Sequence, residues 1–245
     1  PYYEPVPIQP TAHYAMGGVP TSVDGQVVID ENNTPLPGLY AAGEVACVSV
    51  HGANRLGTNS LVDLIVFGRR AGKHIAAKWL PEAEFAPLPP NPDEYATEMV
   101  ERLLSSAKGK GETQEAIRQE LRDEMMAKVG VVRDDAMLSA MQTKIAELKE
   151  RFATVRLMDT SRAFNTELME VVELGNLLEC AEATIAGARA RKESRGAQYR
   201  SDYPKRDDAN FLKHTLAYRT ETAGQPELRY KPVVLGTFEP KERKY

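Results

Sequence analysis

The sequence predicts an α/β region, then an all-α region folded as an antiparallel helical bundle, and finally a short tail that contains β structure. Three observations carry this prediction. Residues 1–80 combine glycines with short apolar runs, residues 81–92 hold five prolines, and residues 93–193 carry apolar side chains at helical spacing. Proline at that density ends a helix and is typical of a linker. Residues 194–245, polar at first and then alternating, form the tail.

Composition narrows the class of protein. The chain has 245 residues, 42% of them hydrophobic, which is enough for one large domain or two smaller ones. Its 31 basic and 35 acidic residues give a net charge of −4, so no nucleic-acid partner is expected. Cys47 and Cys180 indicate neither a disulfide framework nor a metal site, and they favour a reducing compartment. No apolar run reaches the roughly 18 residues that span a bilayer, so we expect membrane association only through a partner.

The first 80 residues are expected to place two strands before a long helix. The run 27–29 predicts a short strand, and the run 38–43 predicts a second, buried strand. A helix follows the next loop, with Asn59 or Ser60 as its N-cap and Asp63 in its first turn. Its apolar stripe is so broad that we expect the first turns to be buried almost all round.

Four helices are predicted in the all-α region. Apolar positions predict them near 95–107, 117–129, 138–155 and 168–188, the second of them stopped by Gly130. Between 138 and 155 the apolar residues alternate spacings of three and four, which is the seam of a helix packed lengthwise on a neighbour. Helices with such faces form a small antiparallel bundle.

The tail is expected to contain a small β hairpin. Alternation over 215–220 and 228–230, with Gly224-Gln225-Pro226 between them, predicts its two strands and its turn. Gly196 can end the preceding helix. Arg195 is interpreted as structural or interfacial, not catalytic.

Two segments near the N-terminus carry residue types that point to ligand binding. Gly43-Glu44 ends the predicted buried strand, and the carboxyl end of a strand is where α/β sheets bind ligands. Gly43 would admit a ligand to the backbone, and Glu44 can accept hydrogen bonds from sugar hydroxyls. His13 precedes Gly17-Gly18, a pair that indicates close approach of the backbone to another group. The alternatives are that Glu44 is only an exposed acid and that His13 has a structural role.

Arg55 lies in a loop of small residues directly before the predicted helix. The free N–H groups at a helix N-terminus, together with the helix dipole, favour negative charge. A flavin that takes up electrons develops negative charge over its N1 and O2 edge, and such a helix start would stabilise it. Arg55 itself can hold a carboxylate through two parallel hydrogen bonds. The alternative is a surface loop with a solvated arginine.

Together these segments resemble the succinate dehydrogenase and fumarate reductase flavoproteins. The resemblance covers essentially the whole chain and is carried by PTAHYAMGGVPT, LPGLYAAGEVACVSVHGANRLGTNSL, VDLIVFGRRAG and ESRGAQYRSDYPKRDDANFLKHTLAY. It implies that His13 and Arg55 bind the two ends of a dicarboxylate, that Glu44 contacts FAD, and that the backbone of Ser60 and Leu61 meets the isoalloxazine. The implied fold is the C-terminal part of an FAD-binding domain of two-dinucleotide type, followed by the bundle and the tail.

Other parts of that family's site are not found in this sequence. There is no G-x-G-x-x-G, because Gly109-Lys110-Gly111 is followed by Gln114 where the third glycine belongs. In the family this fingerprint, the histidine bonded to FAD and the arginine that moves the substrate proton lie upstream. The chain also begins at Pro1, without an initiator methionine. We therefore expect a fragment with no catalytic residue, no metal ligand and only part of the FAD site, inactive alone.

The resemblance also implies an activity and partners. The protein is expected to oxidise succinate to fumarate, with hydride passing to FAD and electrons to an iron–sulfur subunit and quinone, and to meet membrane anchor subunits indirectly. The string VSVHGANRLGTNSL resembles the dehydrogenase branch most. Fumarate reductase, L-aspartate oxidase and a non-catalytic scaffold for the iron–sulfur subunit are the alternatives. The expected location is peripheral, on the cytoplasmic face of the bacterial inner membrane or, alternatively, the matrix side of the mitochondrial inner membrane.

Overall fold

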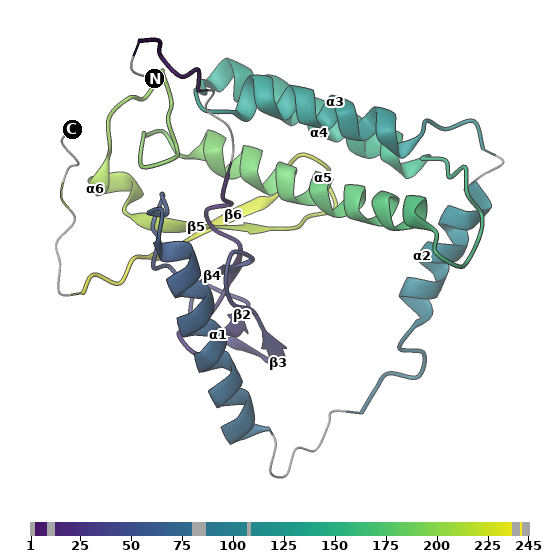
Figure 1. Ribbon diagram of the computed structural model, residues 1–245, viewed down its shortest axis with the longest axis horizontal. Coiled ribbons are helices and arrows are strands. Elements are labelled where there is room, and N and C mark those ends of the chain that lie inside the picture. The colour runs from purple at the N-terminus through teal and green to yellow at the C-terminus, as the bar shows by residue number, and fades with distance from the viewer. Residues whose placement is uncertain (1–2, 9–12, 80–86, 107–108, 237–240, 242–245) are drawn as a thin grey trace.

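The chain folds as an N-terminal α/β region and a C-terminal helical bundle (Figure 1). This computed structural model describes residues 3–8, 13–79, 87–106, 109–236 and 241. Residues 81–86 of the predicted linker lie outside the described residues, and residues 87–92 form neither helix nor strand. The fold class predicted from sequence is confirmed, while the division into domains at 81–92 stays a prediction.

Four short strands form the β part of the N-terminal region: β1 (Val19–Pro20), β2 (Gln26–Val28), β3 (Pro35–Tyr40) and β4 (Ala46–Cys47). β1 pairs with β4 in parallel, and β2 pairs with β3 as an antiparallel hairpin. The prediction of a buried strand at 38–43 was wrong in its bounds and its burial. The carboxylate of Asp30 accepts from the N–H groups of Asn32 and Thr34 and closes the turn early. β3 therefore starts at Pro35, and it is mostly exposed because β2 is its only strand neighbour among the described residues.

The long helix α1 (Asn59–Lys78) begins one turn before Asp63, with Thr58 as its N-cap. The predicted caps were therefore wrong, and Asp63 lies beyond the first turn. The expected burial was also wrong, since Leu61 is 68% exposed and Ile65 is 71% exposed. Within the described chain only the side of α1 that carries Asp63 and Ala71 is covered.

The bundle consists of α2 (Glu94–Ser105), α3 (Gln114–Val129), α4 (Asp135–Ala153) and α5 (Thr166–Ala190). All four helices were predicted; Ala107, the expected end of the first, lies outside the described residues. α4 packs against both α3 and α5. The heptad spacing predicted a seam over 138–155, and its first four residues, Leu138, Met141, Ile145 and Leu148, are fully buried. Phe152 is only partly buried, and Val155 is buried but lies beyond the end of α4. None of the helices in the described part of the chain is long and apolar enough to cross a bilayer.

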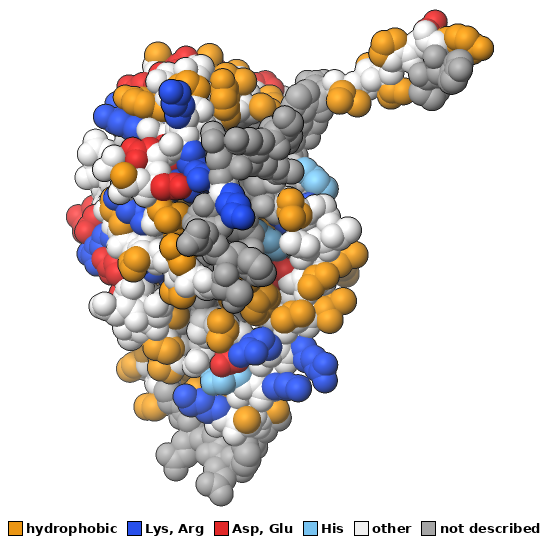
Figure 2. Space-filling model, turned by 90° about the vertical axis from the view of Figure 1, so that its left-hand side faces the viewer, with side chains coloured by type: hydrophobic (Ala, Val, Ile, Leu, Met, Phe, Trp, Pro, Cys, Tyr) orange, Lys and Arg blue, Asp and Glu red, His pale blue; other side chains and the backbone are white. Residues whose placement is uncertain are grey.

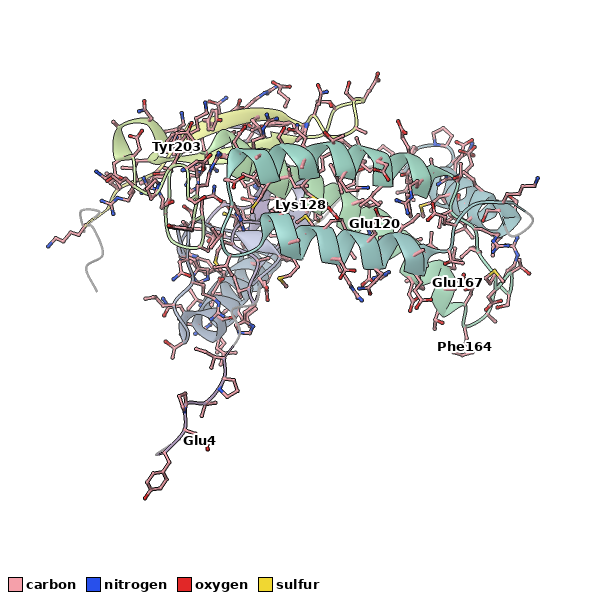
Figure 3. The ribbon with its side chains drawn as sticks, turned by 90° about the horizontal axis from the view of Figure 1, so that it is seen from above. Glu4, Glu120, Lys128, Phe164, Glu167 and Tyr203 are labelled. Atoms are coloured by element: carbon pink, nitrogen blue, oxygen red, sulfur yellow. The ribbon has the colours of Figure 1, made fainter. Side chains whose placement is uncertain are left out.

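Charged side chains connect α3 to α4 outside this core. Glu120 of α3, labelled in Figure 3, forms ion pairs with two residues of α4, Lys144 at 3.1 Å and Arg151 at 2.6 Å. The pKa of Arg151 is raised, first by its hydrogen bonds to Glu112 and Glu120. These pairs are half-exposed, so they set the register of the two helices more than they stabilise the bundle.

The tail contains α6 (Asp208–Phe211) and the antiparallel strands β5 (Lys213–Tyr218) and β6 (Glu227–Pro232). The hairpin predicted from alternation is present. It packs on α5, and it also reaches the N-terminal region, because Lys231 Nζ donates to Asn33 Oδ1 at 2.9 Å and His214 Nε2 lies 2.9 Å from Ser49 Oγ. The hairpin thus joins the bundle to the α/β region through side chains far apart in sequence.

Gly196 does not end the last bundle helix, as had been expected. α5 already ends at Ala190, and Gly196 lies in the turn closed by hydrogen bonds between Arg195 and Gln198. It has a φ of +57°, and a Cβ there would lie 2.6 Å from the carbonyl oxygen of Ala53. Gly196 is therefore required where the tail touches the loop that holds Arg55.

Candidate functional site

Arg55 is held by its own loop and by an aromatic ring. Its Nη1 donates to the carbonyl oxygens of Gly57 at 2.7 Å and Leu56 at 3.3 Å. Its guanidinium carbon lies 4.3 Å from the centre of the Tyr14 ring, a cation–π arrangement. Its backbone N–H faces the sulfur of Met16 at 3.2 Å. The segment that follows His13 therefore lies directly against the Arg55 loop.

The remaining donors of Arg55 are unsatisfied within the described residues. Nε is buried without a hydrogen-bond partner, and Nη2 has no acceptor there. Buried donors of a guanidinium are almost always paired, so an unpaired edge indicates a place for an anion. A planar carboxylate is the group that best matches this edge.

Glu44 contacts the segment that carries His13, but no hydrogen bond of the described chain joins it to the His13 side chain. Glu44 Oε1 accepts from the backbone N–H of Ala15 at 3.0 Å, which ties the His13 segment to the end of the β part. The His13 side chain is exposed, and within the described chain it makes no hydrogen bond or ion pair with Arg55 or Glu44. The structure therefore brings the His13 segment beside Glu44, and the role of His13 in binding a ligand stays a prediction.

Two glycines, Gly18 and Gly43, are required by the packing of the chain itself. Gly18 has a φ of +121°, and a Cβ there would lie 2.4 Å from the carbonyl oxygen of Val45, next to the β1–β4 pairing. Gly43 has a φ of +81°, and a Cβ there would meet Leu64 of α1 at 2.3 Å. Close approach is therefore present at Gly18, with a neighbouring segment of this chain as the partner, and absent at Gly17 among the described residues. That Gly43 admits a ligand stays a prediction.

Ser60 and Leu61 occupy the first turn of α1. Thr58 makes no side-chain capping hydrogen bond, and no acidic residue lies in the first turn. The first N–H groups of α1 are therefore not satisfied by a side-chain cap, in contrast to those of α5, where Asn165 caps Leu168 at 2.8 Å. An uncapped helix start favours an anionic or electron-rich partner, which fits the edge of a reduced flavin.

The sequence analysis missed a contact between His51 and Asp63 near Arg55. His51 Nε2 lies 2.9 Å from Asp63 Oδ2, with side chains 14% and 4% exposed. The His51 ring meets Tyr14 edge-on, with centroids 5.8 Å apart. Asp63 had been interpreted as a residue that complements the helix dipole. The available signal was an acid inside the apolar run LVDLIVF, twelve residues after a histidine.

A small cavity of about 20 Å³ lies among these residues and is lined by Tyr14, His51, Asp63 and Cys47. Burial raises the pKa of the Cys47 thiol. The pKa of Tyr14 is raised by partial burial and by the charges of Asp63 and Glu44, against the opposing effect of Arg55. Such a space is large enough for one water molecule. It belongs to the support of the Arg55 loop, since it is too small for a substrate.

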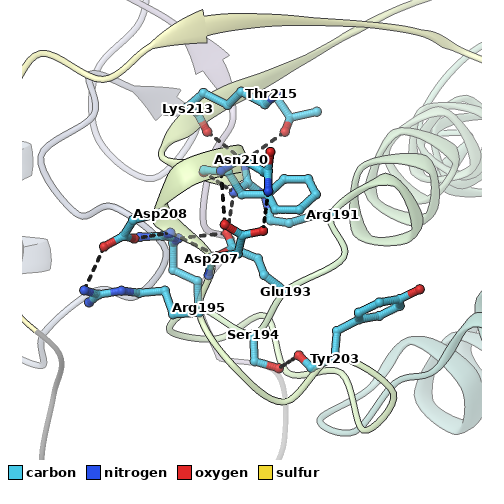
Figure 4. A network of polar contacts seen from close by, with 12 residues as sticks. Arg191, Glu193, Ser194, Arg195, Tyr203, Asp207, Asp208, Asn210, Lys213 and Thr215 are labelled. Carbon is cyan, nitrogen blue, oxygen red and sulfur yellow. Dashed lines mark hydrogen bonds and ion pairs between the residues drawn. The ribbon is translucent and has the colours of Figure 1, made fainter.

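The Arg55 loop is braced from the tail by a network of buried charges, drawn in Figure 4. Glu193 is fully buried and pairs with Arg191 at 2.7 Å and Arg195 at 2.8 Å, while Arg195 also pairs with Asp208 at 2.6 Å. Burial pushes the pKa of Glu193 up, but the hydrogen bonds from its partners outweigh burial and lower it.

This network fixes the turn that contacts the Arg55 loop, because the Ala197 N–H donates to the carbonyl oxygen of Ala53 at 2.8 Å. The interpretation of Arg195 as a structural residue agrees with these contacts.

A larger, open groove lies on the outer surface of α1. Arg69, Lys73 and His74 line, with Val66, an open groove of about 550 Å³, and Figure 2 shows basic side chains beside hydrophobic ones on this side of the molecule. Arg70 in the same groove is already paired with Asp24 at 2.8 Å. None of the residues predicted from sequence to bind a ligand lines this groove, so the Arg55 loop is the better candidate site.

Comparison with known proteins agrees with the fold. Residues 1–61 match the family model of an FAD binding domain, and residues 118–245 match that of the fumarate reductase flavoprotein C-terminal region. The two matches define the class of protein, an FAD-dependent flavoprotein. The chain belongs to the succinate dehydrogenase and fumarate reductase flavoprotein family.

Individual relatives cover almost all of this chain. It is 43% identical over 243 residues to the succinate dehydrogenase flavoprotein subunit of Coxiella burnetii, covering 98% of this chain and 41% of that protein. It is 45% identical over 244 residues to the 8-methylmenaquinol:fumarate reductase flavoprotein subunit of Wolinella succinogenes, covering 99% of this chain and 38% of that protein. The chain thus spans about two fifths of the length of these relatives.

Solved structures show the same fold. A chain of E. coli quinol fumarate reductase superposes with a TM-score of 0.82 at 39% identity, covering 98% of this chain and 40% of that one. A Mycobacterium smegmatis Sdh1 chain, from the complex with UQ1, superposes with a TM-score of 0.74 at 31% identity, covering 91% of this chain and 36% of that one.

Proposed function

We propose that this chain is the C-terminal part of a succinate dehydrogenase flavoprotein subunit, which oxidises succinate to fumarate. The observation that carries the proposal is the Arg55 guanidinium. It is held on Tyr14 shortly before the start of α1, which has no side-chain cap, and its buried Nε has no partner among the described residues. A cation built to receive a carboxylate, directly beside a helix start suited to an electron-rich ring, fits dicarboxylate oxidation by a flavin.

Each predicted site residue has a role in this proposal. Arg55 binds one carboxylate of succinate through its unpaired edge, and His13 binds the other end. The first N–H groups of α1, at Ser60 and Leu61, face the flavin, and Glu44 holds part of FAD. FAD supplies the acceptor for the hydride that leaves the substrate. Two anchors at the ends of the substrate restrict its orientation, which lowers the entropic cost of reaching a reactive geometry.

The same proposal assigns partners and a location. Electrons pass to an iron–sulfur subunit and then to quinone, and membrane anchor subunits are reached only through that partner. The subunit lies peripherally on the cytoplasmic face of a bacterial inner membrane, or on the matrix side of a mitochondrial one. The support is that the relatives are named as flavoprotein subunits, and that no helix in the described ranges qualifies as a membrane span.

Fumarate reductase is the second candidate, because relatives named for that activity match the chain equally well. Both directions use one dicarboxylate site, so the residues around Arg55 do not distinguish them. Direction follows from the redox potentials of the cofactors and of the quinone.

The test is to purify the native protein that carries this chain and measure succinate-dependent dye reduction alongside fumarate reduction by a low-potential dye. We expect both reactions, with succinate oxidation faster, while the 245-residue chain given FAD alone shows neither. A native protein that oxidises L-aspartate and neither oxidises succinate nor reduces fumarate would refute the proposal. A faster fumarate reaction would favour the second candidate.

A further inference from the structure

A buried His51–Asp63 contact next to Arg55 has no role in the function proposed above. Asp63 lies on α1 between Val62 and Leu64, and only 4% of its side chain is exposed. His51, at the start of the Arg55 loop, holds it with Nε2 at 2.9 Å from Oδ2. A carboxylate removed from water is costly even when it is paired. An apolar residue would fill this position at lower cost if only packing mattered.

The pair reaches Arg55 through Tyr14. The His51 and Tyr14 rings meet at an interplanar angle of 82° with centroids 5.8 Å apart, and the Arg55 guanidinium carbon lies 4.3 Å from the Tyr14 centroid. The pKa of Tyr14 is raised first by burial and then by the charge of Asp63, so the field of this carboxylate reaches the ring. Contacts therefore run without a gap from α1 to the guanidinium.

Arg55 depends on such support because no carboxylate of the described chain pairs with it. Its side chain rests on two loop carbonyls and on the face of one aromatic ring. A guanidinium held in this way keeps its positive charge available for an external anion. A direct ion pair with Asp63 would hold Arg55 equally well but would compete with the substrate. His51 occupies Asp63 Oδ2 instead.

We propose that Asp63 and His51 are positioning residues for dicarboxylate binding: they fix the Tyr14 ring, and the ring fixes the Arg55 guanidinium. The inference rests on the proposed function, since it concerns the same substrate clamp. Neither residue touches the substrate. Their effect is on affinity, because a guanidinium that samples several orientations must be ordered before it can grip a carboxylate.

The test uses the native protein that carries this chain, with succinate as substrate and malonate as a non-reacting dicarboxylate probe. Asp63→Asn and His51→Gln are each expected to raise the KM for succinate and the Kd for malonate about tenfold, equivalent to about 1.4 kcal/mol. We expect kcat to change less than about threefold. The double variant should be no worse than either single variant, because the two residues act as a unit.

Matched variants distinguish a loss of Arg55 positioning from a general loss of folding. Asp63→Glu should recover most of the affinity. Asp24→Asn, which removes a charge that contacts Arg70 on the same helix, should leave both constants unchanged. Tyr14→Phe keeps the ring and should bind normally, whereas Tyr14→Leu should bind as weakly as Asp63→Asn. The Tyr14 variants test the idea even if substitution of Asp63 prevents folding.

The outcomes distinguish this inference from the function on which it rests. A wild-type protein that neither oxidises succinate nor binds malonate overturns the proposed function itself. An active wild-type protein whose Asp63→Asn and Tyr14→Leu variants keep their KM and Kd, even with a lowered Tm, overturns the positioning role and leaves the function standing.

Discussion

The bundle and the start of α1 are both rich in apolar residues, yet these residues are mostly buried in the bundle and exposed at the start of α1. In the bundle, the seam of α4 and the inner face of α5 are fully buried, and both helices have side-chain N-caps. At the start of α1 the apolar side chains are exposed, the buried residue is an aspartate, and the N-cap makes no side-chain bond. Apolar periodicity therefore predicts which face of a helix can be buried, but not whether a neighbouring segment covers it. Among the described residues, such a neighbour is present in the bundle and missing at the start of α1.

The largest expected effect comes from truncating matched isoleucines in these two helices. Ile145→Ala in α4 removes a fully buried side chain and should lower the free energy of unfolding by about 4 kcal/mol. Ile65→Ala in α1 of the same 245-residue chain removes a side chain that is mostly in water and should change it by less than about 0.5 kcal/mol. Urea denaturation followed by circular dichroism measures both. Equal losses would show that the start of α1 is buried in solution.

A smaller effect is expected at the tail network that braces the Arg55 loop. Glu193→Gln leaves Arg191 without a carboxylate partner and Arg195 with Asp208 alone. It should cost about 3 kcal/mol, because the arginine charges are then poorly compensated in a largely buried network. The folded-state pKa of Glu193 is lowered from its ordinary value of 4.5. Its contribution is therefore present above pH 4.5 and is lost as the pH falls through the lower, folded-state pKa.

Stability measured from pH 7 down to pH 3 checks this prediction. The wild-type chain should lose stability more steeply than Glu193→Gln as the pH falls through the acid range, so that the two curves converge. Parallel curves over the whole range would contradict the assignment of this carboxylate as a stabilising charge in the tail.

Much of the fold could be predicted from local pattern, and the reason is visible in particular residues. Leu138 to Leu148 alternate spacings of three and four, and that seam is enough to fix which face of α4 is buried. The alternation in β5 likewise predicted the hairpin. By contrast, the bounds of β3 depend on the turn at Asp30 and on pairing with β2, which a short apolar run does not encode.

The sequence predicted that the candidate site binds an anion, but it did not predict which residues hold Arg55 in place. An arginine among small residues before a helix indicated an anion site, and Nε of Arg55 is buried without a partner among the described residues. The role of Asp63 depends on a histidine twelve residues away that folds back onto α1, and no local pattern reports such a contact. The partners of Gly18 and Gly43 were likewise tertiary neighbours, Val45 and Leu64.

The most direct test of the account is the affinity of the native protein for a dicarboxylate with Arg55 intact and with Arg55→Lys. Lysine keeps the positive charge and removes the planar pair of donors, so the Kd for malonate should rise by at least about tenfold. Isothermal titration calorimetry measures it without turnover. An unchanged Kd in a folded, FAD-loaded Arg55→Lys protein would contradict the claim that this guanidinium holds the substrate.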